Sequence, residues 1–538
     1  MPDSHVDYVV VGAGTAGCVL AARLSVDPQC SVALLELGGM DTNPAIYTPG
    51  LDPMYSLWAP QGAENWGYAT VPQSGLGGRS IDIARGKVLG GSSTINAMVY
   101  IRGNYRNFDT WAQLGNRGWS YVEVLPYFKK SETYHGPLSQ YHGDNGPMPV
   151  IDLQKPSVVS HAFVEAAAEL GATQKYNDFN GASQEAGAGF YQSTRTVDGI
   201  RATAGSAFVK PILGRKNLQL LSQVRATRLI IEQDRARGVE YAGPDGVTTI
   251  RAEREVVVCC GAFETPKLMM LSGLGPAEQL ATHDIPVVQD LPGVGQNLMD
   301  HLLVGGVAFE SLVPLDPPEL LAEGGLFLWS GTQTDQVSPD LQYFFGPVQY
   351  VAPEYLTDGP GFTFAPILTQ PRSRGTVTLT SSDPTALARI DPQYLSRDED
   401  LAVLEYGIRY ARELVHTSAF DKLRGRELAP GEAVTSTSEL RDYIRRVCGT
   451  VWHPVGTCRM GTDREAVVDD QLRVHGVAGL RIVDASVMPE LVNGNSNAAV
   501  MMIAEKAADV IRGDNLPSAS GSRWSDQTSA HTTAVGQS

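Results

Sequence analysis

The chain has 538 residues and a formal net charge of −17 at pH 7; 43% of its residues are hydrophobic and 19% are charged. This composition is typical of a globular protein with enough apolar residues for a sizeable core. An acidic surface repels phosphate backbones and anionic lipids, so we expect neither nucleic acid nor a membrane surface as a partner.

No segment of the sequence predicts a targeting or membrane-spanning element. The apolar stretch 6–24 lacks a basic leading region and is interrupted by three glycines, unlike a signal peptide. No uninterrupted apolar run reaches the roughly 18 residues that a spanning helix needs. The six cysteines show no metal-ligand spacing, so we expect reduced cysteines, no metal and a cytoplasmic protein.

The first 37 residues predict one β-α-β unit. Residues 6–11 form an apolar, β-branched run that is typical of a buried parallel strand. Apolar residues at helical spacing follow over 14–25, and a second strand is predicted over 31–37.

The glycines Gly12, Gly14 and Gly17 lie between this strand and this helix in the pattern GxGxxG. Such glycines allow a tight turn, a close backbone approach to a pyrophosphate and close packing of helix on strand. The amides at the helix start, Thr15 and Ala16, offer N–H donors to that anion. Glu36 ends the next strand, where a carboxylate can accept from ribose hydroxyls. A dinucleotide site is predicted, but a merely tight strand-helix turn has the same pattern, and the motif does not choose between FAD and NAD.

Later segments are predicted from their periodicity and composition. An extended stretch without periodicity is expected over 43–85, helices over 157–170, 401–414 and 497–512, and strands over 217–233, 248–258 and 376–380. Residues 306–445 have no nucleotide-type glycine motif and are a candidate for a substrate-covering domain. The Ser-, Thr-, Gly- and Gln-rich end of the chain, 516–538, is predicted to be disordered.

Seven blocks in order resemble the glucose-methanol-choline (GMC) oxidoreductase family. They are the GxGxxG turn with Glu36, GKVLGGSSTIN at 86–96, GAFETP at 261–266, PGVGQNLMDH at 292–301, HPVGTCRMG at 453–461, VDASVMP at 483–489 and NGNSN at 493–497. NWGY at 65–68 and YIRGN at 100–104 are most similar to the choline dehydrogenase-like, bacterial alcohol dehydrogenase branch.

The resemblance implies an α/β fold, with a Rossmann-like FAD-binding domain and a discontinuous α+β substrate-binding domain built on an antiparallel sheet. We expect the FAD domain over 5–160, 195–305 and 450–515, and the substrate domain over 161–194 and 306–449. It further implies that FAD lies against Gly90, Gly91, Ser92, Asn96, Ala97, Val224, Gly261, Asp484, Ala485 and Ala498. Ile95 stands where relatives with covalent flavin carry a histidine, so dissociable FAD is predicted.

His453 and Asn497 are the predicted catalytic residues. Removal of a hydride from an alcohol requires its hydroxyl proton to leave or to be strongly hydrogen-bonded, and imidazole can accept that proton near neutral pH. Asn497 can hydrogen-bond the substrate oxygen but cannot accept a proton, and its other interpretation is a helix N-cap. The resemblance assigns the base role to His453 and implies oxidation of an alcohol, with hydride transfer to the flavin.

Several alternatives stay open at this point. The flavin could be reoxidised by O2, as in an oxidase, or by a quinone or another carrier, which the branch favours. A lyase of the same fold, a flavoprotein without turnover and an NAD enzyme are the other classes. His301 is interpreted as structural and Cys458 as packing. Trp66 and Tyr68 are as compatible with core packing as with a substrate entrance, and Arg85, Arg102 and Arg459 with phosphate contacts as with loop anchoring.

Overall fold

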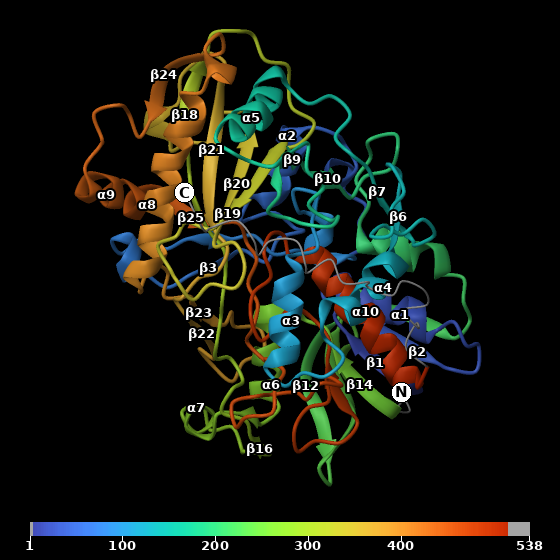
Figure 1. Ribbon diagram of the computed structural model, residues 1–538. Coiled ribbons are helices and arrows are strands. Elements are labelled where there is room, and N and C mark those ends of the chain that lie inside the picture. Colours follow the sequence, from blue (N-terminus) through green and yellow to red (C-terminus); the bar gives the residue numbers. More distant parts are fainter. Residues whose placement is uncertain (1–3, 515–538) are drawn as a thin grey trace, which may run out of the picture.

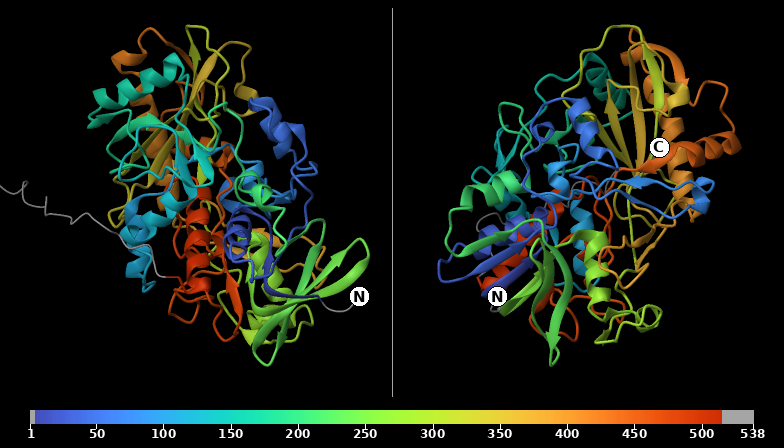
Figure 2. Two further views of the ribbon diagram at one scale, coloured as in Figure 1. Left: turned by 90° about the vertical axis from the view of Figure 1, so that its right-hand side faces the viewer. Right: turned by 180° about the vertical axis from the view of Figure 1, so that it is seen from behind.

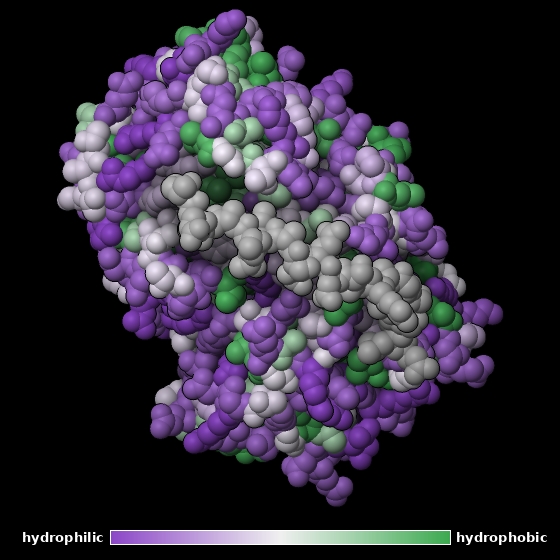
Figure 3. All heavy atoms as spheres, in the orientation of Figure 1, coloured by the Kyte–Doolittle hydropathy of each residue, from purple (hydrophilic) through white to green (hydrophobic). Residues whose placement is uncertain are grey.

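The computed structural model describes residues 4–514, and the predicted disordered segment 516–538 lies outside them. Figure 3 shows that hydrophilic residues cover most of one face, with hydrophobic residues scattered among them, as the charged composition leads one to expect. Within the described range, no helix has the length and apolar character needed to cross a bilayer.

A seven-stranded sheet forms one half of the molecule (Figure 1). Its order is β11 (Leu218–Leu221), β2 (Val32–Leu35), β1 (Ser4–Val11), β14 (Gly246–Val258), β13 (Arg235–Gly243) and β12 (Arg225–Glu232), and β26 (Leu480–Ile482) also pairs with β14. The strands around β1 are parallel, whereas β12, β13 and β14 form antiparallel hairpins. The residues of β1 and β2 run apolar because both faces of this part of the sheet are covered.

Helix α1 (Thr15–Leu24) packs against β1 and β2, and α10 (Asn497–Arg512) lies beside α1 (Figure 2). The predicted β-α-β unit is confirmed, and the predicted helix 497–512 has the observed bounds. It ends where Gly513 adopts the left-handed conformation, with φ of 74°. Arg23 of α1 forms a bidentate ion pair with the buried Glu505 of α10, at 2.7 and 2.8 Å.

A nine-stranded sheet forms the other half. Its main path is β24 (Arg424–Ala429), β18 (Val307–Ser311), β21 (Gly361–Leu368), β20 (Leu341–Gly346), β19 (Gly324–Leu328), β9 (Gly187–Phe190) and β8 (Gln174–Lys175). All these pairings are antiparallel except that of β8 with β9. Helices α5 (Val158–Glu169) and α8 (Asp398–Val415) pack against it, and α9 (Thr437–Val447) packs on α8.

Two short strands, β17 (Leu302–Val304) and β25 (Cys448–Thr450), extend the nine-stranded sheet towards the half that contains the seven-stranded sheet. β17 pairs antiparallel with both β21 and β25, with Leu302 opposite Thr450. His301 directly precedes β17, and His453 follows β25 by three residues. The α/β class with an antiparallel second sheet is as predicted, whereas the assignment of residue ranges to cofactor and substrate domains stays a prediction.

The smaller elements complete the chain. They are α2 (Leu51–Trp58), α3 (Tyr105–Gln113), α4 (Tyr121–Ser131), α6 (Gly261–Leu271), α7 (Ala277–Ala281), and the paired strands β3 (Tyr68–Ala69) with β4 (Asp82–Ile83), β5 (Val99–Tyr100) with β10 (Gln192–Ser193), β6 (Glu132–Tyr134) with β7 (Met148–Val150), β15 (Leu274–Gly275) with β16 (Gln289–Asp290) and β22 (Thr376–Thr378) with β23 (Arg389–Asp391).

Three local predictions were wrong. The stretch 43–85 contains α2, whose eight residues bury Met54 and Leu57 but are too few for a clear helical period. The predicted strand 217–233 is two strands, β11 and β12, at opposite ends of the sheet. The predicted strand 31–37 shortens to Val32–Leu35, although the Glu36 backbone N–H still donates to the Leu221 carbonyl while its side chain binds backbone amides.

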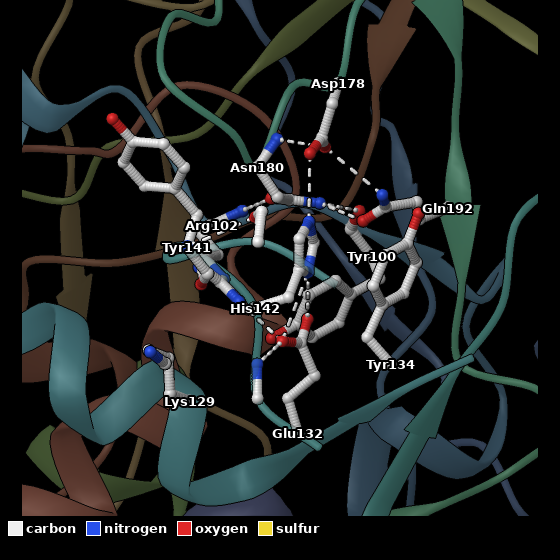
Figure 4. Close-up of polar contacts among 12 residues, drawn as sticks. Tyr100, Arg102, Lys129, Glu132, Tyr134, Tyr141, His142, Asp178, Asn180 and Gln192 are labelled. Atoms are coloured by element: carbon white, nitrogen blue, oxygen red, sulfur yellow. Dashed lines mark hydrogen bonds and ion pairs between the residues drawn. The ribbon is translucent and has the colours of Figure 1, made fainter. Parts of the chain in front are cut away.

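A buried charge network holds the segment that leads out of β5 (Figure 4). Arg102 donates to Glu132 at 2.7 Å and to the Tyr141 carbonyl at 2.6 Å. His142 lies between two carboxylates, with Nδ1 3.2 Å from Glu132 and Nε2 2.9 Å from Asp178. Burial alone lowers the pKa of His142, but the bonds to Asp178 and Glu132 outweigh it, so this pKa is raised.

We expect His142→Gln to destabilise the fold by about 1 to 2 kcal/mol, because Glu132 and the partly exposed Asp178 lose a charged hydrogen-bond donor while Glu132 keeps Arg102. The raised pKa of His142 means that its contribution is complete below about pH 6.5, the value of an unfolded histidine, and is lost as the pH rises through the folded value. The Tm difference from the unmodified protein should therefore shrink between pH 6 and pH 9. The exposed neighbour His135→Gln is the control; equal effects of the two variants would contradict this role.

Candidate active site

One cavity runs between the two sheets and collects most of the predicted site residues. Those that line it are Gly12, Gly14, Thr15, Ala16, Glu36, Gly91, Ser92, Asn96, Ala97, Val224, Gly261, His453, Asp484, Ala485 and Asn497. They come from six of the seven sequence blocks, together with Ala97 directly after the second block and Val224 before β12. Segments from both ends of the chain therefore meet at one place.

Three predicted residues lie outside the cavity wall. A Cβ on Gly17 would come within 1.9 Å of the Gly12 carbonyl oxygen, so Gly17 permits the close packing of α1 on β1. Gly90 has φ of 90°, and its amide donates to the Ala13 carbonyl at 2.8 Å. Ala498 is buried within α10. Each shapes backbone that borders the cavity.

Glu36 organises the glycine-rich turn. Its carboxylate accepts from the Ala13 amide at 2.9 Å and from the Gly38 amide at 2.7 Å. Burial raises the pKa of this carboxyl to about 7, against the lowering effect of those amide donors. Because each carboxylate oxygen has a further lone pair, Glu36 can still accept from a ligand hydroxyl in the cavity.

The nucleotide end of the cavity has the donors that an anionic cofactor requires. Helices α1 and α10 both begin at the cavity, and neither Gly14 nor Ser496, their N-caps, provides a side-chain cap. Free helix N-termini bind phosphate through backbone N–H groups and the helix dipole. A Cβ on Gly91 would lie 2.7 Å from the Gly14 Cα, so the two loops approach as closely as glycines allow. The residues present therefore fit a dinucleotide.

Asp484 ties two further cavity segments together. One carboxylate oxygen accepts from the Gly261 amide at 2.8 Å and from the Thr265 hydroxyl at 2.6 Å, and the other accepts from the Ser486 amide at 2.8 Å. Asp484 thereby fixes the start of α6 against the loop after β26.

His453 lies on a tightly held turn. Its backbone N–H donates to Asp300 at 2.7 Å, and the other oxygen of Asp300 accepts from Tyr394 and Thr450 at 2.6 and 2.5 Å. The preceding residue, Trp452, has a positive φ of 61°, which is unusual for a bulky side chain. Such strain persists only where surrounding contacts enforce it, and it commonly occurs at functional sites.

A hydrogen-bond chain determines which nitrogen of His453 carries the proton. His301 Nε2 lies 3.1 Å from the Thr369 carbonyl oxygen, which only accepts, so His301 is protonated at Nε2. His301 Nδ1 must then accept, and its partner at 3.0 Å, His453 Nδ1, must donate. A neutral His453 consequently has its free lone pair on Nε2, which lies 3.1 Å from Asn495 Nδ2.

The surroundings also keep both imidazoles neutral. Burial, then the neighbouring His301 and the cation of Arg85, hold the pKa of His453 well below its usual value. Burial likewise lowers the pKa of His301 to about 3. Arg85 donates to the Trp452 carbonyl at 2.6 Å and so anchors the turn that carries His453. A neutral, oriented imidazole can act as a proton acceptor at neutral pH.

The sequence prediction for the amide partner needs refinement. Asn497 lines the cavity, but its side-chain oxygen accepts from Thr15 at 2.7 Å and its side chain does not cap α10. The amide that contacts His453 is that of Asn495, whose Oδ1 is buried and has no hydrogen-bond partner within residues 4–514. Asn495 and Asp300 both lie in sequence blocks that resemble the family. Their contacts with His453 were not predicted, because a sequence motif does not show where a side chain points.

The remaining candidates divide between the cavity and distant structure. Trp66 and Tyr68 line the cavity and stack at 5.5 Å, with the Tyr68 hydroxyl 2.5 Å from Glu264. Arg102 belongs to the buried network beside β6, and Arg459 pairs with Asp463, so neither arginine lines the cavity. Cys458 is buried and free. His301, interpreted as structural from sequence, is the direct partner of His453.

Residues 6–303 match the family model of the N-terminal part of GMC oxidoreductases, and residues 371–504 match that of the C-terminal part. The chain is 41% identical to an alcohol dehydrogenase [acceptor] of Pseudomonas putida over 94% of this chain and 95% of that protein. It is 39% identical to an oxygen-dependent choline dehydrogenase of Brucella anthropi, with the same coverage. The solved structure of a pyridoxine 4-oxidase from Mesorbium loti matches with a TM-score of 0.87 and 35% identity, over 95% of this chain and 100% of that one.

We expect His301→Leu to slow the reduction of bound FAD by an alcohol about 10- to 100-fold. This is the usual scale for loss of a residue that orients an imidazole. Without an acceptor at its Nδ1, His453 is free to adopt the other tautomer. His301→Gln is the matched control, because its amide oxygen can replace the lost acceptor. Single-turnover reduction rates of both variants test this; equal rates in the Leu and Gln variants would show that the acceptor is not what matters.

Proposed function

We propose that this chain, which belongs to the GMC oxidoreductase family, oxidises a primary alcohol to the aldehyde with His453 as the base. The chain is an FAD-dependent oxidoreductase that acts on CH–OH groups, as its relatives of this family do. The observation that carries the role of His453 is its oriented Nε2 lone pair at the cavity, beside an unpaired amide oxygen.

The residues around His453 divide the work. His453 Nε2 accepts the hydroxyl proton, and the alcohol takes the place that the Asn495 amide now occupies beside that nitrogen. Asn495 and Asn497 hold the alcohol oxygen by hydrogen bonds. Bound FAD supplies the acceptor for the hydride that leaves the carbinol carbon. The alcohol thus loses one proton and one hydride and becomes an aldehyde, and the fixed tautomer of His453 means that its ring need not turn before proton transfer.

We also propose that the flavin is reoxidised by a quinone-type or other carrier rather than by O2. The similarity to an alcohol dehydrogenase [acceptor] supports this choice, and the similarity to an oxidase makes O2 the alternative. A cytoplasmic location is proposed with it, because all six cysteines are free, which suits a reducing compartment.

Anaerobic addition of primary alcohols should bleach the oxidised-flavin absorbance of the purified protein. His453→Ala should slow that bleaching by about two or more orders of magnitude, the usual scale of acid–base catalysis. The control is His416→Ala, an exposed histidine at the end of α8. Bleaching at an unchanged rate in His453→Ala would remove this residue from the mechanism, and flavin recovery on admission of air would be slow for a dehydrogenase and fast for an oxidase.

FAD should be released by acid precipitation. Ile95 is buried at the cavity, its carbonyl accepts from Trp58 at 2.6 Å, and its side chain has no nucleophile for a flavin bond. We expect the yellow chromophore in the supernatant after centrifugation. Colour that stays in the pellet would contradict non-covalent binding.

A further inference from the structure

We propose that the substrate end of the cavity selects alcohols with an uncharged, apolar tail and discriminates against choline, although choline dehydrogenases are among the relatives. This inference rests on the proposed function and concerns what the same site accepts. It is carried by the charges of the cavity wall.

The wall beside His453 is apolar. His301, the hydrogen-bond partner of His453, directly precedes β17, and Leu303 two residues later lines the cavity. Leu303 clusters with Ala365, Ile367, Phe344 and Val451. Of these, Val451 lies two residues before His453, and both follow β25, the strand that pairs with the β17 strand of Leu303. An alcohol with its hydroxyl at His453 therefore has apolar side chains beside its tail.

No charge is available on this wall. None of the cavity-lining residues between 303 and 365 is charged. The described carboxylates that line the cavity are Glu36, Glu264 and Asp484. Glu36 and Asp484 bind backbone amides, and Glu264 accepts from Tyr68 and pairs with Lys267. Glu36 directly follows β2, Glu264 lies on α6 and Asp484 lies in the loop after β26, so all three are outside the nine-stranded sheet.

Two charged side chains bond to the turn that carries His453, and of these two Arg85 lines the cavity whereas Asp300 does not. Arg85 donates to the carbonyl of Trp452, the residue before His453, and after burial and His301 it contributes to the lowered pKa of His453. A quaternary ammonium beside this turn would meet the same positive field. The negative charge of Asp300 is already shared among Tyr394, Thr450 and the His453 amide.

Most of the aromatic rings that line the cavity pack against one another; the rings are those of Trp58, Trp66, Tyr68, Phe263, Phe344, Tyr350 and Trp452. A cage for a quaternary ammonium needs several open ring faces around one point. Trp58 and Trp452 pack edge-to-face against each other at 4.8 Å, and Arg225 covers the ring of Trp66 at 5.7 Å. Burial of an uncompensated cation in apolar surroundings is strongly unfavourable. The wall therefore favours a neutral tail.

The test compares choline with 3,3-dimethylbutan-1-ol, which has the same shape but a carbon in place of the charged nitrogen. Each alcohol is added anaerobically to the FAD-loaded protein, and the rate constant of flavin reduction is divided by the Kd of that alcohol. This ratio should be about 100-fold or more higher for the neutral alcohol than for choline. Equal or faster reduction by choline would overturn this inference and leave the proposed function intact. Failure of every alcohol in a wider panel, including hexan-1-ol, would instead overturn the proposed function and this inference with it.

A pair of matched variants tests the wall itself. Leu303→Glu places a carboxylate beside the base, whereas Leu303→Gln has the same shape without the charge. Choline should gain relative to 3,3-dimethylbutan-1-ol by about 10-fold or more in the Glu variant over the Gln variant. An unchanged ratio between two variants that both retain FAD would show that Leu303 does not face the substrate tail.

Discussion

The antiparallel pairing of β17 with β25 is the constraint on which the site depends. It places Leu302 opposite Thr450, and the residues just outside this ladder, His301 and His453, meet through their Nδ1 atoms at 3.0 Å. Because a shift of one residue in such a pairing turns side chains to the other face, the register itself determines whether the two imidazoles touch. The same ladder brings Asp300 to the backbone amide of His453. The positions of His453, His301 and Asp300 therefore all depend on the short pairing of β17 with β25.

The tautomer of the base follows from a backbone group rather than from a charge. The Thr369 carbonyl at the end of β21 accepts from Nε2 of His301, so Nδ1 of His301 must accept from Nδ1 of His453. The position of the proton on His453 is thereby determined. Asp300 contacts the backbone of His453 and not its ring. The imidazole therefore remains neutral, because burial, His301 and Arg85 all oppose its protonation. A carboxylate on the ring would raise the pKa of the base instead.

The cavity has two chemically different ends, and each sheet supplies one of them. The seven-stranded sheet contributes glycine turns, uncapped helix starts and two carboxylates that bind backbone amides, which suits a polar anionic cofactor. The nine-stranded sheet contributes an uncharged wall around Leu303 and Phe344. A reaction that moves a hydride from an apolar alcohol to a dinucleotide needs this division, since the two ligands meet only where the sheets approach each other.

The sequence by itself determined the β-α-β unit, the bounds of the last helix and the residues that approach the cofactor cavity. These features depend on local patterns: an apolar run, a glycine spacing or a helical period predicts its own structure without reference to distant residues. It also selected His453 through a resemblance in seven blocks. It did not find α2, which is too short for its period, nor the contacts of His453 with His301 and Asn495. Those contacts join residues 152 and 42 positions apart in the sequence. Only the tertiary structure could decide them, because strand register and side-chain direction determine which buried groups share a hydrogen bond, and neither is written in the local pattern.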